Sequence, residues 1–201
     1  MARIIVCRHG NTFDKGDTVT RVGGRTDLPL SISGKAQATA LAAHFAGTPF
    51  TAAYCSALQR TRETAQAILD ACNGSPDLEE LPFLREVDYG PDENQPEEEV
   101  VARLGEAAIR AWDEDGKVPD GWKVDVAGIR DGWRRLITRA SNMPEDAIIL
   151  VVTSNGVARF LPGVVKDKPA DLDRKLKTGA WGEVIVDGGQ SRIVSWNQRP
   201  A

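Results

Sequence analysis

Residues that bind metals or form disulfide bonds are scarce in this sequence. It contains two histidines, His9 and His44, and three cysteines, Cys7, Cys55 and Cys72. Neither a Cys-x-x-Cys pair nor a His-Glu-x-x-His motif occurs, so we expect no dedicated metal site. The cysteines are odd in number and two of them lie in strand-like segments, which favours buried free thiols in a reducing cytoplasm.

Long apolar runs and a surplus of basic residues are also absent. No apolar run approaches the length needed to cross a membrane. The segment Met1-Ala2-Arg3 leads directly into a strand-like run, so we expect no signal peptide, no membrane partner and a cytoplasmic location. The 25 Lys and Arg residues against 29 Asp and Glu give a net charge of −4, which argues against a nucleic acid as the main partner.

The remaining composition is typical of a folded globular protein. Hydrophobic residues make up 41% and charged residues 27% of its 201 positions. A chain of this length usually folds around one substantial core. We therefore expect a single domain over residues 1–201.

Strand-like apolar segments alternate with helical patterns along the chain. Strands are predicted at residues 2–7, 50–55, 79–84 and 147–152, helices at 34–45, 100–112, 126–140 and 157–161, and a hairpin at 181–186 and 192–196. One more helix is predicted to begin at Ser56, where Gln59 completes a capping box, and to end before Gly74. This alternation predicts a three-layer α/β/α fold whose central sheet is mainly parallel with an antiparallel edge.

The end of the first predicted strand is the most informative segment. Residues 2–7 are apolar and rich in β-branched side chains, as in a strand buried on both faces of a parallel sheet. Arg8, His9 and Gly10 follow at its carboxyl end, where open α/β sheets bind ligands. An arginine beside a histidine at that place suggests an anion held next to a nucleophile; the alternative is a surface Arg-His pair at a strand end.

Two further polar side chains are expected on the same rim of the sheet. Arg60 lies in the first turn of the helix after the second strand, and Glu86 follows the third strand. Arg8, Arg60 and the helix N-terminus together would clamp a phosphoryl group. Nearby positive charge would keep His9 in its neutral, nucleophilic form, and Glu86 could protonate a leaving-group oxygen.

Polar loops supply the other candidate binding groups. The glycine-rich loop at residues 10–30 is interpreted as functional rather than disordered, with Asn11, Gly23 and Gly24 close to the substrate. The acidic segment 88–99 either lines the entrance, where it would repel highly anionic substrates, or faces solvent. His44 follows an apolar helical stripe and is interpreted as a structural or surface residue.

Several motifs together resemble the histidine phosphatase superfamily, which includes the cofactor-dependent phosphoglycerate mutases. They extend from residue 3 to residue 159. They are Arg8-His9-Gly10; Asp27 to Ser31 with Gly34, Gln37 and Ala38; Ser56 to Arg60 with Glu63, Thr64 and Ala65; Leu84 to Glu86 with Gly90; and Val151 to Thr153 with Gly156 to Arg159.

This resemblance implies a reaction and a role for each motif residue. His9 would accept the phosphoryl group, Arg8 and Arg60 would hold its oxygens, and Glu86 would donate the proton. Water would then resolve the phosphohistidine in a phosphatase, and a second substrate hydroxyl would do so in a mutase. The implied partner is a small phosphorylated molecule, with no metal or organic cofactor; a homo-oligomer stays open.

The chain departs from the family pattern at Ser154. The family has a second histidine there, which helps to bind the phosphoryl group and to stabilise the transition state. A serine donates a hydrogen bond without a charge, a loss of roughly 2–4 kcal/mol or 10²–10³ in rate. Ser154 and Asn155 would form an adapted anion site. Lys15 stands where the family often has a Trp-Asn pair, and either supplies the missing cation or is a solvated surface lysine.

The leading interpretation is a metal-independent phosphatase with reduced activity on a small phosphomonoester. A catalytically impaired relative that binds a phosphorylated ligand or a protein is the alternative that Ser154 supports. A phosphoglycerate mutase-type enzyme ranks lower, because the helix from Ser56 to Ala65 looks more like the phosphatase branch. A cysteine phosphatase is excluded, since four residues rather than five separate Cys55 from Arg60.

Overall fold

The computed structural model describes residues 1–200. Its centre is a six-stranded mixed sheet with the strand order β3-β2-β4-β1-β5-β6. The strands are β1 (Ala2–Arg8), β2 (Ala52–Cys55), β3 (Leu78–Glu80), β4 (Ile148–Thr153), β5 (Trp181–Asp187) and β6 (Gln190–Gln198). Strands β1 to β4 are parallel to one another, and the β5–β6 hairpin pairs antiparallel to β1. The predicted mainly parallel sheet with an antiparallel edge is therefore confirmed.

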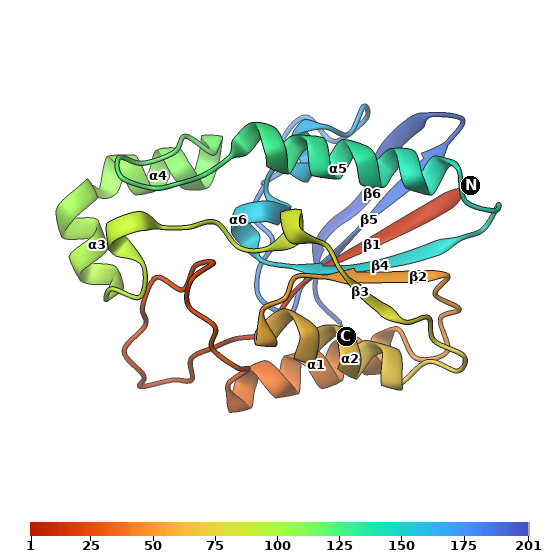
Figure 1. Ribbon diagram of the computed structural model, residues 1–201, viewed down its shortest axis with the longest axis horizontal. Coiled ribbons are helices and arrows are strands. Elements are labelled where there is room, and N and C mark those ends of the chain that lie inside the picture. Colours follow the sequence, from red (N-terminus) through yellow and green to blue (C-terminus); the bar gives the residue numbers. More distant parts are fainter. Residues whose placement is uncertain (201) are drawn as a thin grey trace.

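Helices cover both faces of the sheet (Figure 1). Helices α1 (Ile32–His44) and α2 (Gln59–Asp70) lie on one face, and α5 (Val126–Ser141) lies on the other. Successive side chains of β1 point to opposite faces, so Ile5 and Cys7 join the core under α1 and α2, while Ile4 and Val6 join the core under α5. This double burial explains why residues 4–7 of the strand are apolar without interruption, and it gives the expected three layers.

The segment predicted as a third strand, 79–84, is mostly not a strand. Strand β3 ends at Glu80, and Pro82–Leu84 forms a short 3₁₀ turn, η1. Proline has no N–H to donate to a strand ladder, so the pairing stops before it. The turn lies against α5 and delivers Glu86 to the rim of the sheet.

The helical region after η1 also differs from its prediction. A 3₁₀ turn, η2, covers Gly90–Asp92. The single helix predicted at 100–112 is two helices, α3 (Glu97–Leu104) and α4 (Glu106–Asp115). Gly105 separates them with a φ of +82°, which a helix does not allow.

The start of α2 is capped differently from the predicted capping box. The helix begins at Gln59, and Ser56 lies directly after β2 and outside the helix, where its hydroxyl pairs with that of Thr61. The backbone N–H of Gln59 instead donates to the carboxylate of Asp27 at 2.7 Å. A residue from the 10–30 loop therefore caps the helix that carries Arg60.

The remaining elements follow the predictions closely. Helix α6 (Asn155–Ala158) starts two residues before the predicted 157 and is followed by a 3₁₀ turn, η3 (Leu161–Gly163). The three cysteines are buried and free, as expected. His44 ends α1, and its ring lies 5.1 Å from that of Trp181, in a structural contact. Within residues 1–200, no helix is long and apolar enough to cross a membrane.

Candidate active site

His9 lies one residue beyond β1 and is 6% exposed. Its backbone N–H donates to Thr153 at the end of β4, which fixes its position between the two central strands. Its ring Nδ1 lies 2.7 Å from the carbonyl oxygen of Gly10, and its Nε2 lies 3.3 Å from Nε of Arg60. Since a carbonyl can only accept, Nδ1 carries the proton and Nε2 keeps its lone pair.

The imidazole of His9 is held neutral. Burial is the largest cause that lowers its pKa well below the ordinary value, and the charges of Arg60 and Arg8 lower it further. The hydrogen bond to Gly10 acts in the opposite direction but is the smallest of these effects. His9 is therefore in the nucleophilic form at neutral pH, as the sequence predicted.

Arg60 lies in the first turn of α2 and is 1% exposed. Besides the bond to His9, its guanidinium donates to the carbonyl oxygens of Thr26 at 2.9 Å and Gly23 at 3.2 Å. Arg62 lies two positions further on, points outward and pairs with Glu80. Arg60 is thus buried at the cavity, whereas Arg62 is exposed.

Arg8 faces the same cavity from the end of β1. One terminal nitrogen donates to the carbonyl oxygen of Leu176 at 3.0 Å. Its Nε is buried and has no hydrogen-bond partner among residues 1–200. A buried donor without a partner is costly, so this N–H is available to an oxyanion. Burial lowers the pKa of Arg8, and the carboxylate of Glu86 opposes that effect.

Glu86 reaches this cavity from the loop after η1 and is 8% exposed. One carboxylate oxygen accepts from the N–H of Val87 at 2.9 Å, and the other accepts from the N–H of Gly156 at 3.3 Å. The carboxylate is the strongest influence that raises the pKa of Arg60 against the effect of burial. The structure thus brings Arg8, His9, Arg60 and Glu86 together, although they come from three separate stretches of the sequence.

Gly23 and Gly24 do not line the cavity. The carbonyl oxygen of Gly23 accepts from Arg60, the N–H of Gly24 donates to Val87 at 2.8 Å, and the carbonyl oxygen of Gly24 accepts from Arg85 at 2.7 Å. These two glycines join the first loop to the segment that carries Glu86. They position the site without facing it.

The other sequence candidates divide into two groups. Asn11 and Asn155 line the cavity, and the side-chain oxygen of Asn155 is held by the N–H of Leu176 at 2.9 Å. Lys15 is exposed and is not among the described residues that line the cavity. Ser154 also is not among them: it is fully buried directly after β4, and its hydroxyl has no hydrogen-bond partner within residues 1–200.

The cavity encloses about 410 Å³, and several of the residues that line it were not among the site residues predicted from the sequence. They include Arg21, Tyr89, Trp112, Arg159 and Lys175. The guanidinium of Arg159 lies 4.3 Å from the ring centroid of Trp112 and reaches Asp113 at 3.3 Å. Arg159 belongs to one of the family-like motifs, Arg21 lies in the 10–30 loop and Tyr89 lies in the 88–99 segment, whereas nothing in the sequence pointed to Trp112 or Lys175.

The acidic segment 88–99 is neither simply an entrance nor simply a solvated face. Asp92 is 2% exposed and accepts from Arg103 and from the ring N–H of Trp122. Glu93 accepts from the backbone N–H groups of Arg25 and Tyr89. Glu97 alone of its acids lines the cavity, where it pairs with Arg21, whereas residues 98 and 99 are exposed.

Curated relatives match this chain in sequence over between about two thirds and nearly all of its length. "Probable phosphoglycerate mutase GpmB" of Erwinia tasmaniensis is 28% identical over 193 residues, which is 95% of this chain and 87% of the relative. A 2,3-bisphosphoglycerate-dependent phosphoglycerate mutase of Gloeobacter violaceus is 31% identical over 134 residues, 65% of this chain and 60% of the relative.

Solved structures share the fold over almost the full length. A mycobacterial glucosyl-3-phosphoglycerate phosphatase matches with a TM-score of 0.79 and 21% identity, covering 97% of this chain and 98% of its own. The alpha-ribazole phosphatase of Shigella flexneri matches with a TM-score of 0.75 and 22% identity, covering 98% and 96%. The sequence profile described as "Histidine phosphatase superfamily (branch 1)" matches residues 4–199. The resemblance read from the motifs is confirmed: the chain belongs to the histidine phosphatase superfamily.

Proposed function

We propose that this protein is a metal-independent phosphatase that hydrolyses a small phosphomonoester through a phosphohistidine on His9. The observation that carries the proposal is the state of His9. Its ring is neutral, Nδ1 is tied to Gly10, and the lone pair of Nε2 lies beside Arg60 in a cavity shared with Arg8 and Glu86. Such an arrangement suits attack on phosphorus.

The arginines suit the transferred group. Nε of Arg8 is a buried donor without a partner among residues 1–200, and Arg60 uses three of its five N–H groups within the protein. The remaining donors would bind the oxygens of the phosphoryl group, where negative charge is spread in the transition state. An oxyanion would thus remove the cost of the unpaired donor of Arg8.

The proposed hydrolysis has two steps, transfer of the phosphoryl group to His9 and its release to water. In the first, Nε2 of His9 forms a bond to phosphorus, the phosphorus–oxygen ester bond breaks, and Glu86 gives its proton to the leaving alcohol oxygen. In the second, the Glu86 carboxylate takes a proton from water as the water oxygen attacks phosphorus. The nitrogen–phosphorus bond breaks, inorganic phosphate leaves, and His9 is again neutral.

Ser154 is expected to limit the rate. It stands directly after β4, where the family has a second histidine, and its buried hydroxyl is not among the groups that line the cavity. We infer a loss of roughly 2–4 kcal/mol in transition-state stabilisation. Arg159 and Lys175 line the cavity and supply positive charge there, so they replace Lys15 as the groups that compensate for part of this loss.

Two other functions have an observation in their favour. A phosphoglycerate mutase-type transfer is favoured by the names of the curated relatives. In a mutase a substrate hydroxyl receives the phosphoryl group from His9, whereas in a phosphatase water receives it. An impaired relative that only binds a phosphorylated ligand is favoured by Ser154. The buried Glu86 beside a neutral His9 argues for catalysis, because a binding module has little use for an acid there.

The experiment is an assay of phosphate esters in the presence of a chelator. We expect release of inorganic phosphate by the wild type and none by His9→Ala. Glu86→Gln should impair alkyl phosphates far more than p-nitrophenyl phosphate, whose leaving group needs little protonation. Transfer to 3-phosphoglycerate without phosphate release would favour the mutase. Binding of vanadate without turnover of any ester would favour the impaired relative.

A further inference from the structure

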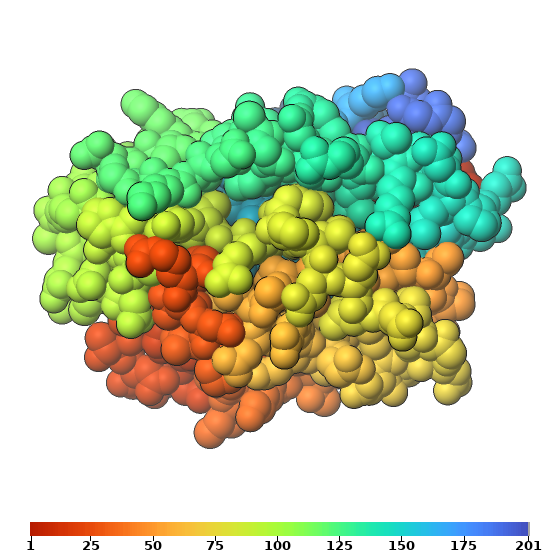
Figure 2. Space-filling view, in the orientation of Figure 1, coloured from red at the N-terminus to blue at the C-terminus, as the bar shows by residue number. Residues whose placement is uncertain are grey.

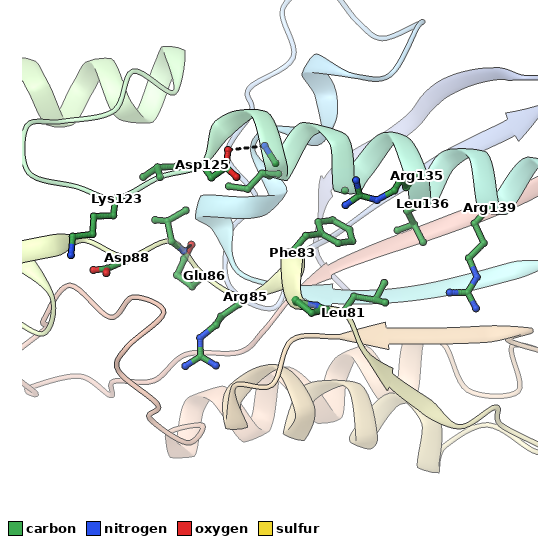
Figure 3. A pocket seen from close by; sticks show the side chains of 16 residues that line it. Leu81, Phe83, Arg85, Glu86, Asp88, Lys123, Asp125, Arg135, Leu136 and Arg139 are labelled. Carbon is green, nitrogen blue, oxygen red and sulfur yellow. Dashed lines mark hydrogen bonds between the residues drawn. The ribbon is translucent and has the colours of Figure 1, made fainter.

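A second cavity lies on the other side of the segment that carries Glu86. It encloses about 710 Å³ between residues 81–88 and helix α5. In Figure 2 the surface is hollowed between α5 and the segment around η1. Figure 3 shows its walls, and we call this cavity the α5 groove. Nothing in the proposed reaction uses it.

The floor of the α5 groove is apolar. Leu81 and Phe83 of the segment around η1 lie across it from Leu136 of α5, and Ile129 also lines it. A Cβ atom on Gly132 would lie 2.3 Å from the ring of Phe83, so a larger residue at 132 would displace this wall. A cavity of this size that combines an apolar floor with charged groups at its edges can hold a small amphipathic molecule.

The carboxylates of the α5 groove are already engaged by the protein. Asp125 accepts from the N–H of Gly128 at 2.8 Å, as the dashed line in Figure 3 marks. Asp88 pairs with Arg25 at 3.0 Å. The charge of Asp88 is thus paired, whereas Asp125 keeps its negative charge at the N-terminus of α5, away from Arg139 (Figure 3).

The protein engages the cations of the α5 groove to different degrees. Arg85 donates to the carbonyl oxygen of Gly24 at 2.7 Å. Within residues 1–200, the side chains of Lys123 and Arg135 have neither a hydrogen bond nor an ion pair. Arg139 lies one turn beyond Arg135 on the same face of α5, reaches Glu79 at 3.4 Å and lies 4.8 Å from the ring centroid of Tyr54. Arg135 and Arg139 are both exposed beside the apolar floor (Figure 3), and the unpaired guanidinium of Arg135 fits a ligand with one anionic end.

We propose that the α5 groove binds a small amphipathic carboxylate, such as a medium-chain acyl or aryl carboxylic acid. Its apolar body lies on Phe83 and Leu136, and its carboxylate binds Arg135 and Arg139. Glu86 lines both this groove and the cavity of His9. A bound ligand therefore restrains residues 85–88 and, through them, the position of the Glu86 carboxylate.

Calorimetric titration with decanoate, below its micelle concentration, tests the binding and is independent of any enzymatic activity. We expect saturable binding to the wild type and none of decyltrimethylammonium, which has the same chain and the opposite charge. Arg135→Glu should weaken decanoate binding by at least about tenfold. Arg134→Glu is the matched control, because Arg134 is exposed on the same helix, pairs with Asp131 and does not line the groove.

Hydrogen exchange with and without decanoate tests the effect on the Glu86 segment. Bound decanoate should slow amide exchange at residues 85–88 in the wild type and leave it unchanged in Arg135→Glu. Absence of saturable binding, equal binding of the cationic probe, or equal loss in the two arginine variants would overturn the proposed site. So would a dimer that Arg135→Glu dissociates, since a second copy would then be the occupant. Binding without slower exchange at 85–88 would overturn the link to Glu86.

Discussion

His9 shows how hydrogen bonds within the protein set the chemistry of one side chain. Its Nδ1 is bound to the carbonyl oxygen of the next residue, Gly10, which leaves Nε2 unprotonated in the cavity. Arg8 and Arg60 lower the pKa of His9 and at the same time present N–H groups to an incoming anion. In the proposed reaction, the same two charges keep the nucleophile neutral and hold its target.

Arg60 and Arg62 give a matched pair of variants for phosphate recognition. Arg60→Ala should abolish vanadate binding, because it removes the buried guanidinium beside His9. Arg62→Ala should leave vanadate binding largely intact, since Arg62 is exposed and pairs with Glu80. Equilibrium titration with vanadate measures both, and thermal unfolding shows that each variant is folded. The opposite order of affinities would show that Arg60 is a structural residue only.

Ser154 stands where the family resemblance implies a second histidine. Ser154→His should raise kcat/KM for p-nitrophenyl phosphate by roughly tenfold or more, because an imidazole adds a charge-assisted hydrogen bond in the transition state. The hydroxyl of Ser154 has no partner within residues 1–200, so the substitution breaks no hydrogen bond found there. Ser154→Ala is the control and should change the rate little. A folded histidine variant that is slower than the wild type would assign the compensating role to Arg159 or Lys175.

Helix α2 illustrates how one element positions the site and depends on a distant loop. Its first turn carries Arg60, and its first N–H group is bound by the carboxylate of Asp27, 32 residues earlier in the sequence. Asp27 was quoted in the sequence analysis only as part of a motif. The capping role could not be read from the sequence, because spacing along the chain shows only local caps such as the predicted Ser56–Gln59 pair.

Asp27→Ala should therefore affect both stability and phosphate binding. Loss of a helix N-cap typically lowers the free energy of unfolding by about 1 kcal/mol. We expect a loss of this size in urea denaturation, together with weaker vanadate binding, because the first turn of α2 is no longer held. Asp27→Asn keeps an oxygen acceptor and should retain most of the stability. Equal effects of the two substitutions would contradict the capping role.

The elements that the sequence predicted well are those with strong periodicity. Strands β1 and β4 and helix α5 are close to their predicted bounds, since burial on two faces or on one stripe leaves a clear pattern. The prediction of a strand at 79–84 was wrong, because the apolar run around Pro82 resembles a strand although proline has no backbone N–H to pair with a neighbouring strand. Gly105 divides α3 from α4 for a similarly local reason.

The whole molecule places Arg8, His9, Arg60 and Glu86 around one cavity at one rim of the sheet, as the strand-end argument predicted. The outer wall was not predictable in the same way. Trp112 and Lys175 come from α4 and from a loop before β5, and neither lies in a motif or at the end of a parallel strand. Only the packing of the whole chain brings them to the cavity.

Burial of a neutral His9 should also appear in the stability of the whole molecule. Its folded pKa lies well below the ordinary 6.5, so between these values the unfolded chain binds the extra proton. Stability should therefore fall as pH drops below 6.5, by up to about 1.4 kcal/mol per pH unit for this one group. Carboxyl groups with a lowered pKa, such as Asp14 at about 2, titrate below this window. Urea denaturation from pH 5 to 8 should show a shallower slope for His9→Asn; equal slopes would contradict the assignment.

The proposed phosphohistidine on His9 can be trapped as an intermediate. Wild-type protein is mixed briefly with p-nitrophenyl phosphate, denatured in base and mapped by mass spectrometry. We expect one phosphoryl group on His9, stable in base and lost in acid, and none in His9→Ala. A phosphoryl group that survives acid, lies on another residue or persists in His9→Ala would contradict it.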